Sequence, residues 1–97
     1  MGIFDFLVKK KDVQYSNEGV HMSERGQHLK ALLKYDQALS LNPDNAVTWY
    51  NRGVSLTALN RHKEALASYD RALALEPGNP EVLEKREYSM REFGGKF

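Results

Sequence analysis

The 97-residue sequence predicts an all-α fold built from two similar helical units and one further helix. The first observation behind this prediction is that the sequence matches itself when it is shifted by 34 residues. The second is that apolar side chains recur every three or four residues inside each unit, which is the spacing of amphipathic helices. The third is the turn sequence that closes each unit, NPDN at residues 42–45 and EPGN at residues 76–79.

The 34-residue shift pairs identical residues along the whole length of the two units, which run over residues 12–45 and 46–79. A fixed period of this size is typical of stacked helical repeats. The matched pairs are Val13 and Val47, Asn17 and Asn51, Gly19 and Gly53, Val20 and Val54, His28 and His62, Ala31 and Ala65, Leu32 and Leu66, Tyr35 and Tyr69, Asp36 and Asp70, Ala38 and Ala72, Leu39 and Leu73, Leu41 and Leu75, Pro43 and Pro77, and Asn45 and Asn79.

Each unit should contain two helices. In the second unit the apolar spacing covers residues 47–59, is interrupted at Asn60 and Arg61, and resumes over residues 62–75. Asn45 and Asn79 are suitable N-caps for the helices that follow them. Residues 80–93 predict one more helix with a sparse apolar face and a charged face, as a terminal capping helix requires, before a frayed tail over 94–97.

The two units resemble tetratricopeptide repeats, whose pattern is W-x2-L-G-x2-Y…A-x3-F…P. One departure is common to both units, because Glu18 and Arg52 replace the leucine before the glycine. The resemblance implies a right-handed superhelical stack whose first helices line a concave groove that binds a protein or peptide. The residues that match the pattern are Tyr15, Gly19, Met22, Ala31, Tyr35, Ala38 and Pro43 in one unit, and Trp49, Gly53, Leu56, Ala65, Tyr69, Ala72 and Pro77 in the other.

The groove that this resemblance implies contains two equivalent asparagines, Asn17 and Asn51. Their amides can donate hydrogen bonds to a peptide backbone and accept hydrogen bonds from it. Chaperone-binding members of the family hold a terminal carboxylate with basic residues and asparagines, but Ser16, Val20 and Glu81 stand at three of those places here. A neutral or amphipathic segment is therefore the expected ligand. The expected partner-binding residues are Asn17, Val20, Tyr50, Asn51, Val54 and Lys85.

The N-terminal segment, residues 1–11, carries more apolar surface than a disordered tail should. Its docking residues are expected to be Ile3, Phe4, Phe6 and Leu7. This short amphipathic segment has three interpretations: a short helix folded back onto the first repeat, an interface with a partner chain or a second copy, or an attachment to a membrane surface through the lysines at 9–11. The last is not expected to suffice, because no second anchor is visible.

Composition argues against several classes of function. The formal net charge is +1 and no basic face with aromatic residues is visible, so nucleic-acid binding is not expected. The chain has no cysteine, which excludes disulfides and favours a cytoplasmic location. No catalytic constellation or cofactor motif is found, and His21, His28 and His62 lack the four-ligand spacing of a zinc site. The sequence therefore predicts a non-enzymatic interaction module or, alternatively, a structural subunit of a larger assembly, with homo-oligomers possible.

Overall fold

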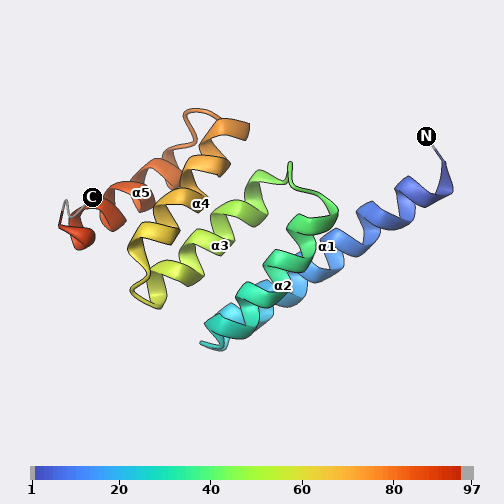
Figure 1. Ribbon diagram of the computed structural model, residues 1–97, viewed down its shortest axis with the longest axis horizontal. Helices are drawn as coiled ribbons and strands as arrows, with labels where there is room; N and C mark the ends of the chain where they lie inside the picture. The colour runs from blue at the N-terminus through green and yellow to red at the C-terminus, as the bar shows by residue number, and fades with distance from the viewer. Residues whose placement is uncertain (1, 95–97) are drawn as a thin grey trace.

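The computed structural model describes residues 2–94 and contains five α-helices in a single stack (Figure 1). They are α1 (Ile3–Glu24), α2 (His28–Leu41), α3 (Ala46–Ala58), α4 (His62–Leu75) and α5 (Pro80–Phe93). Each helix packs against the next along the chain, and α3 also contacts both α1 and α5. The first helices α1, α3 and α5 thus form one layer, and α2 and α4 form the other. The all-α repeat fold predicted from the sequence is confirmed.

Glycine and tyrosine pack together at the same place in both units. A Cβ atom at Gly19 would lie 2.5 Å from the ring of Tyr35, and one at Gly53 would meet Tyr69 in the same way. Only glycine lets the two helices of a unit approach this closely around a buried ring. Both tyrosines are almost completely buried, so this contact forms the centre of each unit.

The tyrosine hydroxyls also link each unit to the next. Thr57 donates its proton to the carbonyl oxygen of Gly53 at 2.9 Å, so its oxygen accepts from Tyr69 and Ser89, each at 3.0 Å. Tyr35 makes the equivalent contacts with Ser23 and Ser55 one unit earlier. Burial raises the pKa of both tyrosines above the ordinary value, so their hydroxyls stay protonated.

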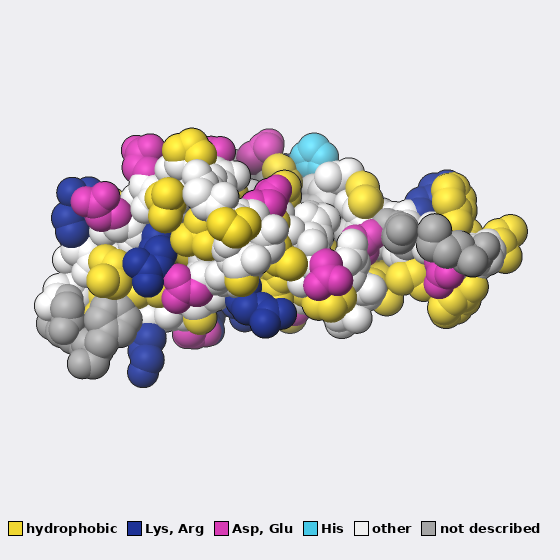
Figure 2. Space-filling model, turned by 90° about the horizontal axis from the view of Figure 1, so that it is seen from above, with side chains coloured by type: hydrophobic (Ala, Val, Ile, Leu, Met, Phe, Trp, Pro, Cys, Tyr) yellow, Lys and Arg dark blue, Asp and Glu magenta, His cyan; other side chains and the backbone are white. Residues whose placement is uncertain are grey.

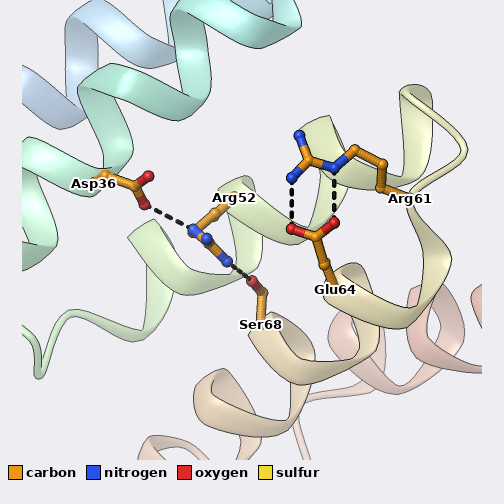
Figure 3. A network of polar contacts seen from close by, with 5 residues as sticks. All are labelled: Asp36, Arg52, Arg61, Glu64 and Ser68. Carbon is orange, nitrogen blue, oxygen red and sulfur yellow. Dashed lines mark hydrogen bonds and ion pairs between the residues drawn. The ribbon is translucent and has the colours of Figure 1, made fainter.

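Ion pairs cross the junctions between successive units at equivalent positions. Arg52 Nε lies 2.8 Å from Asp36 Oδ1, and 34 residues later Arg86 Nε lies 2.6 Å from Asp70 Oδ1. Figure 3 shows Arg52 between Asp36 and Ser68, to whose hydroxyl it donates at 2.7 Å. The departure from the repeat pattern at Arg52 therefore has a structural role, which is to tie α3 to both α2 and α4.

The predicted caps are confirmed. The side chain of Asn45 accepts a hydrogen bond from the Thr48 amide at 3.2 Å, and Asn79 accepts one from the Glu81 amide at 3.1 Å. Pro80 occupies the first turn of α5, where its missing N–H is not needed. These caps satisfy amides that would otherwise lack a partner at the start of α3 and α5.

The N-terminal segment does not fold back onto the first repeat, so the first of its three interpretations was wrong. Residues 3–11 continue α1 as a straight helix that projects beyond α2 (Figure 1). Closer to the first repeat, Asp12 is 2% exposed and accepts a hydrogen bond from Asn42 at 2.9 Å. Neither glycine nor proline interrupts residues 3–12, so the helix has no reason to break there. The predicted tail lies outside the described residues beyond position 94.

Candidate peptide-binding groove

The groove candidate lies between α3 and α5, on the layer formed by the first helices. Two hollows occur there, one of about 280 Å³ and one of about 210 Å³. The ring of Tyr50, in the first hollow, lies 6.0 Å from the ring of Tyr69, in the second, so the hollows adjoin. The first is lined by Ala46, Val47, Tyr50, Asn51, Ala72, Glu76, Asn79, Glu81 and Val82, and the second by Val54, Thr57, Tyr69, Glu84, Lys85, Tyr88 and Arg91.

The first hollow is acidic and offers hydrogen-bonding groups. Its charged lining residues are Glu76 and Glu81, and the hydroxyl of Tyr50 donates to Glu81 Oε1 at 3.3 Å. Burial, together with the charge of Glu81, raises the pKa of Tyr50 to about 12. Tyr50 is therefore a neutral hydrogen-bond donor at physiological pH. A ligand group that donates hydrogen bonds or carries positive charge suits this hollow best.

The second hollow combines an apolar floor with a mixed charged rim. Val54 and Tyr69 form its apolar part, while Glu84, Lys85 and Arg91 supply charges of both signs. At its edge the ring of Tyr88 packs edge-on against His62 at 6.4 Å. This arrangement suits an apolar side chain flanked by polar groups.

The structure brings four of the six predicted partner-binding residues to these hollows. Tyr50 and Asn51 line the first, and Val54 and Lys85 line the second. Asn17 is exposed and Val20 is half-buried on α1, and they line neither hollow. Sequence reasoning did not single out Glu76 or Arg91, because Glu76 lies in a turn and Arg91 stands where the two repeats have Ser23 and Thr57.

The four predicted docking residues lie at the free end of α1. Their side chains are exposed by 79% for Ile3, 73% for Phe4, 64% for Phe6 and 51% for Leu7. Figure 2 shows hydrophobic side chains gathered on the outer surface at the N-terminal end of the molecule, at the right of the view. So much exposed apolar area on a single helical end is unusual for a surface without a partner.

Two histidines, His28 and His62, contact hydroxyls or an aromatic ring within the stack. His28 Nδ1 lies 3.4 Å from the hydroxyls of both Ser23 and Ser55, and His62 packs against Tyr88. Within residues 2–94, no group of three or more side chains is arranged to hold a metal ion. In the same part of the chain, no helix has the length and apolar character needed to cross a bilayer.

Comparison with known proteins agrees with the observed geometry. The profile of the family described as "Tetratricopeptide repeat" matches residues 46–79, and one described as "TPR repeat" matches residues 23–59. The structure is similar to an Arabidopsis OM64 TPR domain, with a TM-score of 0.88 and 19% identity over 91% of this chain and 73% of that one. It is also similar to a point mutant of MamA, with a TM-score of 0.81 and 22% identity over 93% and 71% of the two chains. No curated protein sequence matches the chain.

Proposed function

Because the chain belongs to the tetratricopeptide repeat family, we propose that it is a non-enzymatic interaction module that binds a peptide segment between α3 and α5. The observation that carries this proposal is the pair of adjoining hollows, which together hold four side chains expected to bind a partner. The repeat fold and its structural neighbours support a protein-interaction role in general. A cytoplasmic location remains a prediction from the sequence.

The chemistry of the two hollows specifies the kind of peptide. The acidic first hollow favours a lysine or arginine side chain, which Glu76 and Glu81 would balance. The apolar floor around Val54 favours a leucine-like side chain in the second hollow. The ligand is therefore an amphipathic segment with one basic and one apolar anchor. A surface of this size suits an affinity on the order of micromolar.

The test compares two acetylated twelve-residue peptides that carry the same leucine and differ only in lysine or glutamate at the basic anchor. We expect the lysine peptide to bind about tenfold more tightly by calorimetric titration, because the first hollow is acidic. Asn51→Ala should weaken that binding about fivefold or more by removing an amide from the hollow, with little loss of stability. Gln37→Ala, on the exposed face of α2, is the matched amide control and should leave binding unchanged. Equal affinities for the two peptides would contradict the proposal.

A second function is favoured by the free end of α1. Ile3, Phe4, Phe6 and Leu7 could dock the chain into a larger assembly as a structural subunit. Deleting residues 2–11 would separate the two functions. An assembly subunit should lose its partner, whereas the groove between α3 and α5 should keep its peptide, because no residue of that segment lines either hollow.

A further inference from the structure

Helix α1 carries a stripe that is separate from its packed face and is exposed except at the half-buried Val20. The packed face consists of Asp12, Ser16 and Gly19, which are buried against the rest of the stack. The stripe follows alternating steps of three and four residues, which keeps its members on one side of a helix. Its members are Ile3, Phe6, Lys10, Val13, Asn17 and Val20.

The stripe has the composition of a helix-pairing seam. Phe6 and Val13 are 64% and 50% exposed, although both are apolar, and Asn17 interrupts the apolar positions in the way that a polar residue does in paired helices. The next step along the stripe is Glu24, so a basic residue, Lys10, lies toward one end and an acidic one toward the other. Such a pattern is complementary to itself when two helices run in opposite directions.

We propose that α1 pairs antiparallel with the α1 helix of a second copy of this chain along this stripe. In the register that follows, Phe6 faces Glu24, Lys10 faces Val20, and Val13 faces Asn17 across the pair. Lys10 of each copy then lies about one helical turn, roughly 6 Å along the axis, from Glu24 in the other. A twofold axis makes this contact occur twice. A parallel pair would instead place Lys10 against Lys10.

Stacking the two copies end to end is a poorer alternative. Helix α3 buries Thr48 and Ser55 against the preceding unit. At the two equivalent positions α1 has the larger polar side chains Gln14 and His21. At the other end of the stack, Glu87 occupies the position of Gly19 and Gly53, so no tyrosine can pack there. Neither end of the stack therefore repeats the side chains that join its successive units, and the stripe on α1 remains as a self-complementary surface.

The overlapping part of the pair runs over residues 6–24 and spans about 27 Å of helix, which gives a narrow contact. An interface of this width lies at the small end of stable complexes, so the dimer should form at micromolar to submillimolar concentration. This inference rests on the docking role proposed above for the start of α1, of whose four residues Phe6 lies within the paired part of the stripe. It does not depend on the groove between α3 and α5, so each can fail without the other.

The experiment is light scattering of the full-length protein over a concentration series up to about 300 µM, which covers the affinity expected of a small interface. The expected mass rises from the 11.1 kDa of one chain toward twice that value. Val13→Glu should weaken dimerisation more than about tenfold by placing a charge in the seam. Leu29→Glu is the matched control, because Leu29 is 64% exposed on α2, outside the stripe, and should leave the mass unchanged.

A charge exchange tests the antiparallel register directly. Lys10→Glu and Glu24→Lys should each weaken the dimer about tenfold, and the double variant should restore it to within about threefold. Positions 10 and 24 are about 21 Å apart along one helix, so the rescue cannot arise within a single chain. A monomer at every concentration, or a double variant weaker than either single one, would overturn the proposal. Circular dichroism of each variant confirms that the helices remain folded.

Discussion

Replacing Gly53 with alanine sets two opposing effects against each other. Alanine in place of glycine stabilises a helix by about 1 kcal/mol. The added methyl group, however, would lie 2.7 Å and 2.9 Å from two carbon atoms of the Tyr69 ring, and still closer to a third. Tyr69 is fully buried and its hydroxyl is held by Thr57, so the ring has no space into which to move. Overpacking of this kind costs typically about 1–3 kcal/mol, and three close contacts place it at the upper end.

The expected net loss is therefore about 1–2 kcal/mol in the free energy of unfolding. For a domain of this size, that loss lowers the Tm by roughly 5–15 °C. Urea denaturation followed by circular dichroism measures the free energy directly. Ala67→Gly, at an exposed position of α4, measures the helix-propensity effect alone and should cost about 1 kcal/mol. A Gly53→Ala protein as stable as the wild type, or more stable, would refute the argument that the ring cannot move.

The polar contacts lead to three further predictions. Arg52→Met should cost about 1–2 kcal/mol in urea denaturation, because it leaves the buried Ser68 hydroxyl unpaired, whereas Arg61→Met breaks only an exposed pair and should cost much less. Thr57→Val should cost about 1–3 kcal/mol by the same assay, because the hydroxyls of Tyr69 and Ser89 both lose Thr57 as an acceptor. Because the pKa of Tyr50 is raised to about 12, its contribution to the free energy of unfolding is complete below pH 10 and is lost as the pH rises toward 12. In Tyr50→Phe the free energy of unfolding, measured against pH, should therefore decline less steeply over this range.

The bounds of the helices could be predicted closely because the same capping and turn residues occur in both repeats. Asn45 and Asn79 both cap helices, and the interruption at Asn60 and Arg61 corresponds to the observed end of α3 and start of α4. Asn60 takes a left-handed backbone, with φ of 59°, at the place where Gly26 has φ of 77°. Local sequence determines turns of this kind, since few residues tolerate that conformation.

The course of the N-terminal segment could not be predicted in the same way. Residues 3–11 form a helix in either arrangement, so their composition does not distinguish a folded-back helix from a continuous one. In the continuous helix, neither glycine nor proline occurs before Asp12, and Phe4 and Phe6 stay 73% and 64% exposed. The groove residues were predicted only in part, because the repeat alignment assigns equivalent groove positions to α1 and to α3. The hollows, by contrast, depend on α5, which lies on one side of α3 only.

The hydroxyl contacts between units bear on how the protein unfolds. In a repeat stack, each unit is coupled to its neighbour by an interface energy, and weak coupling lets terminal units fray independently. Here Tyr35 and Tyr69 each share their hydroxyl contacts with the helix of the following unit, through Ser55 and Ser89. Detaching that helix would leave a buried polar group without part of its hydrogen bonding, so half-folded chains carry an added cost. The amide protons of both units should therefore exchange with solvent through one shared opening event, at a single free energy, rather than unit by unit.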